Sequence, residues 1–363
     1  MSSVLRVRGV VLPEGEHRDL YVDGGTITYD PVDADIAAEG WIVPGLVDAH
    51  CHIGLDDGGP VTEEEAEQQA VADRDGGALL IRDCGSALDT SWVHEREDLP
   101  RLIRAGRHLA RTKRYIRNYA DEVEPLDLPA AVAREAERGD GWVKLVGDWI
   151  SREEGDLAPS FPAETFAEAI RVAHEHDAKV TAHCFGPDVL PGLIEAGIDC
   201  IEHGTGLSLE LIDQMVARGT ALVPTVMQTD KFPEYAAAGG ERFPAYATRM
   251  TELYRSRRDV LMAAHDAGVP IYAGSDGGGI SRHGNVVGEV VALADFGLSP
   301  FEALGAASWR ARSWLGWNAA LDEGSPADFV VYDANPLDDL GVLRHPKLIV
   351  LRGRVVGPQA TAS

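Results

Sequence analysis

Two histidines one residue apart, His50 and His52, end an apolar run that begins at residue 41. In a β-strand, residues i and i+2 point to the same face, so the two imidazoles are expected to project together. Adjacent imidazole nitrogens at the end of a buried strand suit a divalent metal such as zinc. A His-x-His pair also occurs in protein cores and loops without a metal, so its spacing alone does not decide between these interpretations.

Four further residues that could do chemistry accompany strand-like runs later in the chain. Lys144 lies inside the apolar run 141–146, His183 and His203 each end a run, and Asp276 follows one directly. A lone aspartate at such a place is commonly a turn or helix-cap residue, and a lone histidine is commonly a hydrogen-bonded core residue. Lys144 is harder to explain, because burying an ammonium group costs on the order of several kcal/mol unless the group is neutralised or paired.

The segments that must position these residues alternate between strand and helix. Strands are expected at residues 42–49, 78–83, 107–112, 142–146, 179–183, 200–203, 221–225 and 271–274. Helices are expected at residues 63–74, 128–138, 163–176, 209–218, 245–267 and 300–315. This alternation favours an α/β fold, with a (β/α)8 TIM barrel as the first arrangement and an open doubly wound sheet as the second. Catalytic groups of such barrels gather at the C-terminal ends of the strands, so the six residues are expected to meet on one face.

Both ends of the chain are typical of strands alone. Strand-like runs cover residues 4–12, 20–23 and 26–30 at the start, and 328–332 and 348–356 at the end. A Gly-Gly pair at residues 24–25 separates two of these runs, which indicates a hairpin. We therefore predict a small β-sandwich domain built from residues 1–44 and 325–363, with residues 45–324 as the barrel domain.

Composition and charge limit the classes of partner. The 363 residues carry a formal net charge of −26 at pH 7, whereas phosphate contacts need clustered Lys and Arg. A nucleic acid or an anionic membrane is therefore an unfavourable partner, and a small-molecule substrate is expected. The N-terminus lacks an apolar core of signal-peptide length, and no apolar run approaches about 18 residues. The four cysteines form no Cys-x-x-Cys pair, which is typical of buried thiols in a reducing cytoplasm, and a homo-oligomer is compatible with the sequence.

Several segments together resemble the amidohydrolase superfamily of metal-dependent hydrolases. They are residues 44–52 (PGLVDAHCH), 181–183 (TAH), 201–204 (IEHG), 274–276 (GSD) and 324–332 (GSPADFVVY), which span nearly the whole chain. Residues 283–285 (HGN), Glu289 and residues 297–304 (GLSPFEAL) are similar to the imidazolonepropionase-like branch, which includes Xaa-Pro dipeptidases and related carboxypeptidases.

The resemblance implies a site with two divalent metal ions, of which zinc is the expected metal. His50, His52 and Asp276 would hold the more buried ion, and His183 and His203 would hold the more exposed one. Lys144 would bridge both as a carbamate formed with carbon dioxide, because an ammonium group has no lone pair to offer a metal. The ions would polarise the substrate carbonyl and activate a water, and Asp276 would pass the proton of that water to the leaving nitrogen. The expected reaction is hydrolysis of an amide-type C–N bond in an N-acyl amino acid, a dipeptide or a cyclic amide.

The resemblance leaves substrate recognition less defined. His283 lies in a Gly-rich loop after the eighth strand, and Arg114 and Arg117 follow the third strand, so these three residues are the candidates for contact with substrate. Residues 144–149 depart from the Gly-rich segment of the peptidase-like relatives, and residues 224–228 lack a tyrosine that several relatives carry nearby. These departures leave recognition of a peptide carboxylate open.

Two alternatives to a binuclear hydrolase remain. Mononuclear deaminases and imidazolonepropionase-type ring hydrolases often have a glutamate three residues after the fifth-strand histidine, a position that Gly186 occupies here. A catalytically silent scaffold that kept the fold would have damaged ligands, whereas every expected ligand type is present in this chain.

Overall fold

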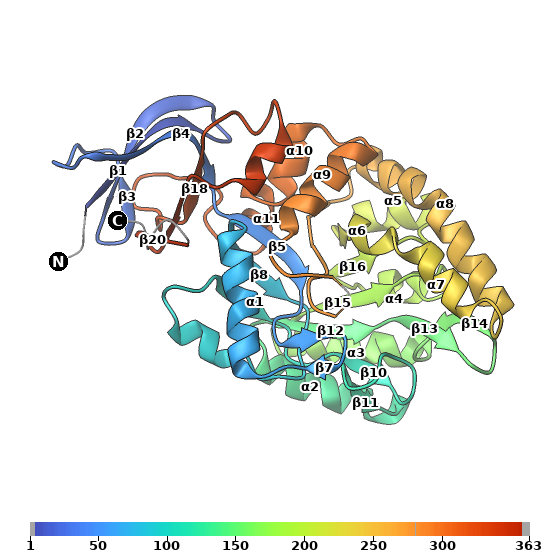
Figure 1. Ribbon diagram of the computed structural model, residues 1–363. Helices are drawn as coiled ribbons and strands as arrows, with labels where there is room; N and C mark the ends of the chain where they lie inside the picture. Colours follow the sequence, from blue (N-terminus) through green and yellow to red (C-terminus); the bar gives the residue numbers. More distant parts are fainter. Residues whose placement is uncertain (1–3, 280, 358–363) are drawn as a thin grey trace.

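The computed structural model describes residues 4–279 and 281–357, which form an α/β core with a mixed β-sheet beside it (Figure 1). Both ends of the chain build the mixed sheet, in the order β20-β19-β18-β4-β1-β2-β3. Its strands are β1 (Leu5–Val11), β2 (Glu16–Asp23), β3 (Thr26–Thr28), β4 (Ile36–Pro44), β18 (Phe329–Tyr332), β19 (Leu348–Leu351) and β20 (Arg354–Val356). Alternate side chains of these strands, such as Val7, Val11, Phe329 and Val331, form a separate hydrophobic cluster.

A single residue, Gly45, joins the mixed sheet to the core. β4 ends at Pro44, and the first core strand, β5 (Leu46–Cys51), begins directly after Gly45. The Gly45 N–H donates to the Asp328 carbonyl oxygen at 2.9 Å, which ties this junction to the returning C-terminal segment. A Cβ atom at Gly45 would lie 2.6 Å from Leu79 Cδ1, so glycine allows the close approach of β5 to its neighbour.

The core strands are parallel and lie in two sheets. The first has the order β5-β8-β9, with β8 (Ala78–Asp83) and β9 (Arg101–Arg104). The second has the order β11-β10-β12-β15-β16-β17, built from β10 (Leu109–Arg111), β11 (Asp121–Val123), β12 (Trp142–Val146), β15 (Lys179–Cys184), β16 (Cys200–His203) and β17 (Ala221–Val223). Every residue of β5, β8, β12, β16 and β17 is buried, as expected for strands covered on both faces.

Helices follow most of the core strands and cover their outer side (Figure 1). They are α1 (Glu63–Asp75), α2 (Leu128–Arg138), α3 (Ala163–Glu175), α4 (Leu190–Glu195), α5 (Leu209–Arg218), α6 (Val226–Thr229), α7 (Phe232–Gly239), α8 (Pro244–Ala267), α9 (Val286–Phe296), α10 (Pro300–Ala306) and α11 (Trp309–Trp314). Short hairpins, β6 (Leu55–Asp56) with β7 (Gly59–Pro60) and β13 (Asp148–Ser151) with β14 (Asp156–Pro159), and three 3-10 turns, at Ser91–Glu95, Pro125–Asp127 and Leu340–Arg344, complete the elements. Every helix in the described ranges is too short or too polar to cross a lipid bilayer.

Several elements differ from those expected from the sequence, and three of these differences concern segments that were predicted. The expected strand at 271–274 makes only individual links: Tyr272 N–H donates to the Leu222 carbonyl oxygen, and Ala49 N–H donates to the Ala273 carbonyl oxygen. The segment still lies between β17 and β5. The expected strand at 107–112 is shorter in the structure and forms β10. The preceding strand, β9, was not predicted, because it has only two apolar residues and an arginine at each end. The expected helix at 300–315 is broken between α10 and α11.

Candidate metal centre

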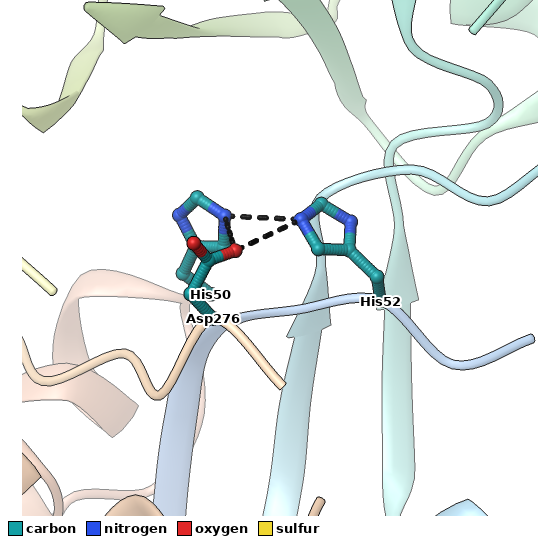
Figure 2. Close-up of side chains that lie close together, drawn as sticks. All are labelled: His50, His52 and Asp276. Carbon is teal, nitrogen blue, oxygen red and sulfur yellow. Dashed lines mark hydrogen bonds and ion pairs between the residues drawn. The ribbon is translucent and has the colours of Figure 1, made fainter. Parts of the chain in front are cut away.

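Three side chains with metal-ligand chemistry meet at the end of β5. His50 Nε2 and His52 Nε2 lie 3.1 Å apart. Asp276 Oδ1 lies 3.1 Å from His50 Nε2 and 3.3 Å from His52 Nε2 (Figure 2). The Asp276 N–H also donates to the His50 carbonyl oxygen at 2.8 Å, so main-chain contact fixes the distance between the two segments.

Asp48 anchors the segment that carries Asp276 against β5. Its buried carboxylate accepts from the Ser275 N–H at 3.0 Å, from the Ser275 hydroxyl at 2.5 Å and from the His50 N–H at 3.1 Å. A Cβ atom at Gly274 would lie 2.5 Å from His50 Cβ, so the close contact of these segments requires glycine. Direct hydrogen bonds therefore join the motifs at 44–52 and 274–276.

A second pair of imidazoles lies at the ends of β15 and β16. His203 Nε2 is 3.0 Å from His183 Nδ1. The ring centroids of His203 and His50 are 5.5 Å apart, so this pair lies next to the group at the end of β5. The structure thus brings together the five histidine and aspartate side chains that the sequence indicated.

Hydrogen bonds on the far side of two rings determine which nitrogen carries the proton. His52 Nδ1 lies 2.8 Å from the Gly85 carbonyl oxygen, which can only accept, so Nδ1 donates and Nε2 of the neutral ring carries a lone pair. The Thr225 hydroxyl donates to the Pro224 carbonyl oxygen at 2.8 Å, and it therefore accepts from His203 Nδ1 at 2.5 Å. His203 Nε2 consequently faces His183 as a lone pair.

Burial keeps three imidazoles of this site in the form that binds a metal. It lowers the pKa of His50, holds that of His183 well below its ordinary value, and lowers that of His203 to about 3. A neutral imidazole offers a nitrogen lone pair, whereas the protonated form offers none.

The backbone of the site adopts strained conformations at three residues. His203, Thr225 and Asp276 have φ values of 64°, 45° and 52°, in the left-handed region that non-glycine residues rarely occupy. Such outliers persist where the surrounding structure fixes them, and they are common at functional sites.

Lys144 of β12 is fully buried, and its ammonium group is paired with the carboxylate of Glu202 on β16. Glu202 also accepts from the Thr181 hydroxyl at 2.7 Å and lies 3.7 Å from the buried Arg82 guanidinium. Burial opposes the charge on Lys144, but attraction to Glu202 outweighs it and raises the pKa of the lysine. The desolvation cost noted from the sequence is thus offset by a buried ion pair.

All six residues of the predicted site line one cavity of about 580 Å³. Aromatic and aliphatic side chains form most of the remaining wall, so the cavity suits a bulky apolar group. The other lining residues are Asp57, Tyr115, Ile116, Tyr119, Trp149, Ile150, Phe185, Gln228, Tyr235, Ala238, Gly239, Arg242, Phe243, Tyr246, Gly278 and Gly279.

The donor atoms fit a divalent metal in both chemistry and spacing. Tetrahedral zinc with ligands at about 2.0–2.1 Å keeps neighbouring ligand atoms roughly 3.3 Å apart. The corresponding separations here are 3.1–3.3 Å among His50, His52 and Asp276, and 3.0 Å between His183 and His203. Lone pairs that face one another at these distances are stable only with a proton or a cation between them.

The sequence pattern of the amidohydrolase family matches residues 41–356 of this chain. The chain belongs to the amidohydrolase family. The resemblance noted in the sequence is therefore confirmed. Amidohydrolases are generally metal-dependent, which agrees with the donor set described above.

Individual relatives agree with this assignment. An uncharacterized protein of Mycobacterium tuberculosis is 53% identical over 357 residues, which cover 98% of this chain and 96% of that protein. Ochratoxinase of Aspergillus niger is 24% identical over 378 residues, which cover 87% of this chain and 77% of the ochratoxinase. A crystal structure of a Xaa-Pro dipeptidase with methionine in its active site has a TM-score of 0.83 at 22% identity, over 97% of this chain and 99% of that one. This likeness shows the fold, which is α/β with a TIM-barrel-like core.

The three residues predicted to contact substrate lie outside the lining of this cavity. His283 Nδ1 bonds to Asp73 of α1 at 2.8 Å. Arg114 donates to main-chain carbonyl oxygens, among them that of Ala158 at 2.8 Å. Arg117 is exposed. The sequence places these residues in loops after strands, but this position alone does not determine the direction of a side chain.

Sequence reasoning missed two residues next to the imidazoles. His108 is fully buried, and its ring stacks on His52 with centroids 4.7 Å apart. Tyr115 lies edge-on to His183, with ring centroids 5.8 Å apart. His108 sits in an expected strand, which was the available signal, but no spacing linked it to a ligand. All four cysteines are buried and free, as expected.

Proposed function

We propose that this amidohydrolase is a binuclear metal-dependent hydrolase that cleaves an amide-type C–N bond. The observation that carries the proposal is that two pairs of histidines line one apolar cavity together with Lys144 and Asp276. We assign His50, His52 and Asp276 to the more buried ion, and His183 and His203 to the more exposed ion, with zinc as the metal. When bound, the metal pair would supply a polarised substrate carbonyl and a water of lowered pKa.

We assign Lys144 as the bridge between the two ions, in the form of a carbamate made with carbon dioxide. Its position supports this, since it lines the same cavity as both imidazole groups. The unmodified amine pairs with Glu202, so carbamate formation requires this ion pair to open. The nearby Arg82 guanidinium and Thr181 hydroxyl remain as partners for the Glu202 carboxylate.

Asp276 is proposed to accept the proton of the attacking water and to deliver it to the leaving nitrogen. Its Oδ1 atom contacts His50 and His52, whereas its Oδ2 atom makes no hydrogen bond to the described residues. A carboxylate with one oxygen fixed and one oxygen free at the cavity wall suits proton transfer, because it keeps its position through both steps.

The cavity wall supports a proposal for the class of substrate. Trp149, Phe185 and Tyr235 supply aromatic surface beside the imidazoles, so an amide with a bulky apolar substituent is the expected substrate. We propose an N-acyl amino acid, a dipeptide or a cyclic amide. The names of the similar proteins, a Xaa-Pro dipeptidase and ochratoxinase, support this range.

We further propose that the core closes into a complete (β/α)8 barrel through segment 271–274. We also propose that residues 4–44 and 325–357, the described part of the predicted ranges 1–44 and 325–363, form one β-sandwich domain beside the catalytic residues 45–324. The buried free thiols support a cytoplasmic location.

Hydrolysis by the zinc-loaded protein tests the proposal. A panel of N-acyl amino acids, dipeptides and cyclic amides, read by release of free amine, should contain at least one compound that is cleaved. Asp276→Asn should lower this activity by about 100-fold or more, in line with loss of a general acid–base group. Binding of metal without hydrolysis of any amide, ester or lactone would support the silent scaffold instead.

A further inference from the structure

Four tyrosines line the cavity, and two of them have hydroxyl groups that are already engaged. Tyr119 donates its hydroxyl hydrogen to the Asp56 carbonyl oxygen at 2.6 Å. The Tyr235 hydroxyl accepts from Gln228 Nε2 at 3.0 Å. These two hydroxyls hold the cavity wall together.

The other two cavity tyrosines differ in that their hydroxyls have no hydrogen-bond partner within residues 4–279 and 281–357. Partly buried phenol hydroxyls usually find a partner, so an unengaged one in a cavity is available to a ligand. Tyr246 lies beside Gly239 of α7. Tyr115 instead lies edge-on to His183, with ring centroids 5.8 Å apart.

Tyr115 also lies next to the other imidazole group through His108. The Tyr115 and His108 ring centroids are 5.7 Å apart, and His108 stacks on His52 at 4.7 Å. Trp149 packs edge-on against the Tyr115 ring at 4.8 Å, which limits its rotation. The phenol ring is therefore fixed in a position that neighbours both groups of ligand-type side chains.

We propose that the Tyr115 hydroxyl is a catalytic group that donates a hydrogen bond to the oxygen of the scissile carbonyl. The inference rests on the proposed amide hydrolysis. As the water oxygen bonds to the carbonyl carbon, the carbonyl π electrons move to the oxygen, and they return when the C–N bond breaks and the nitrogen takes a proton. Tyr115 keeps its own proton throughout, because burial raises the pKa of its phenol well above the ordinary value. Its hydrogen bond strengthens as the oxygen becomes anionic, which stabilises the transition state more than the ground state.

Tyr115→Phe and Tyr246→Phe form a matched pair of variants, because each removes one unengaged hydroxyl from the same cavity. The probe is phenylphosphonate, which combines an aromatic ring with a tetrahedral anionic head. Its dissociation constant is measured by calorimetry with the zinc-loaded full chain. The wild-type protein and Tyr246→Phe should bind alike, whereas Tyr115→Phe should bind roughly 10- to 100-fold more weakly, the usual effect of losing a hydrogen bond to a charged group. Zinc content and thermal midpoint should be the same in all three proteins.

On any amide that the wild-type protein cleaves, Tyr115→Phe should lower kcat by about 100- to 1,000-fold with little change in KM. Equal phenylphosphonate binding by Tyr115→Phe, no binding by the wild-type protein, or loss of zinc from Tyr115→Phe would each overturn the inference. Absence of amide hydrolysis by the wild-type protein would refute the proposed function alone, since the phenylphosphonate comparison would still decide whether Tyr115 contacts a tetrahedral oxyanion.

Discussion

His52 Nε2 lies 3.1 Å from His50 Nε2 at the end of β5, and the ring proton of His52 is on its other nitrogen, bonded to the Gly85 carbonyl oxygen. The lone pair of His52 therefore points at the neighbouring ring and at Asp276. A cation at this point would complete the group. The fold thus orients the His52 ring through a hydrogen bond from Nδ1, the nitrogen that faces away from His50 and Asp276.

Removal of the metal should lower the thermal midpoint of the protein. A ligand that binds only the folded state stabilises it by about 2.7 kcal/mol at a free concentration 100 times the dissociation constant. Differential scanning fluorimetry of chelator-treated protein should therefore show a higher midpoint as zinc is added. His52→Ala should show a much smaller shift, whereas His176→Ala, an exposed position directly after α3, should match the wild-type protein. Equal shifts in all three proteins would contradict this assignment.

Thr225→Val should weaken zinc binding by roughly 10- to 100-fold, the usual effect of losing a hydrogen bond to a ligand histidine. The hydroxyl of Thr225 accepts from His203 Nδ1 and so orients the ring. Competition with a chromophoric chelator measures the affinity. Thr225→Ser keeps the hydroxyl and should keep the affinity. Similar affinities for the valine and serine variants would show that the hydroxyl does not orient His203.

Asp328→Ala should destabilise the protein by about 3–5 kcal/mol, because it leaves the buried Arg312 and the partly buried Arg101 without their carboxylate. Asp328 is fully buried, with Arg101 Nε at 2.6 Å and Arg312 NH2 at 3.5 Å, and it links the mixed sheet to the core. Urea denaturation measures the loss. Asp333→Ala removes an exposed partner of Lys347 and should cost at most about 1 kcal/mol. Losses of the same size in both variants would argue against this link.

The free energy of unfolding should fall as the pH rises from about 5 to 8, because of the buried Glu289 carboxyl. Burial raises the pKa of its carboxyl from 4.5 to about 8, so the folded state holds a proton that the unfolded state has released over that window. The stabilisation is complete below pH 4.5 and is lost as the pH passes the pKa of the folded state. Within the window, each rise of one pH unit removes about 1.4 kcal/mol of this stabilisation.

Urea midpoints of the metal-free protein at several pH values test this linkage. Glu289→Gln stays neutral and keeps one acceptor oxygen for the Val226 N–H, whereas its amide nitrogen replaces the oxygen that accepts from the Met227 N–H. Because this side chain does not ionise, the urea midpoint of the variant should fall less between pH 5 and pH 8. The exposed Glu164→Gln should follow the wild-type protein. An unchanged pH dependence in Glu289→Gln would show that the carboxyl is ionised in the fold.

The sequence was sufficient to predict most of the core, because apolar runs in the strands and helical periodicity are local features of the sequence. α2 and α5 match their expected ranges. The segment 271–274 was predicted as a strand, but it makes only single hydrogen bonds and an isolated bridge to its neighbours. The helix expected at 300–315 breaks near Ser308, whose hydroxyl donates to the Pro44 carbonyl oxygen. Such a contact between distant segments is invisible in a local pattern.

The candidate site likewise contains residues that a local pattern predicts and residues whose partners are distant in the sequence. His50 and His52 were found because strand geometry fixes the direction of side chains two residues apart. His283 and Arg114 lie outside the cavity lining, because loop side chains bond to partners such as Asp73 that only the folded chain brings near. Glu202 lies in the family motif at 201–204, but its pairing with Lys144 depends on the register of β16 in the sheet.

The zinc content and amide hydrolysis of the wild-type protein and of Lys144→Ala test the central proposal most directly. Two ions bridged by a carbamate predict two zinc equivalents in the wild-type protein and at most one in Lys144→Ala, with activity reduced by about 100-fold or more, because the bridge is lost. Less than one equivalent in the wild-type protein, together with undiminished hydrolysis by Lys144→Ala, would contradict the account.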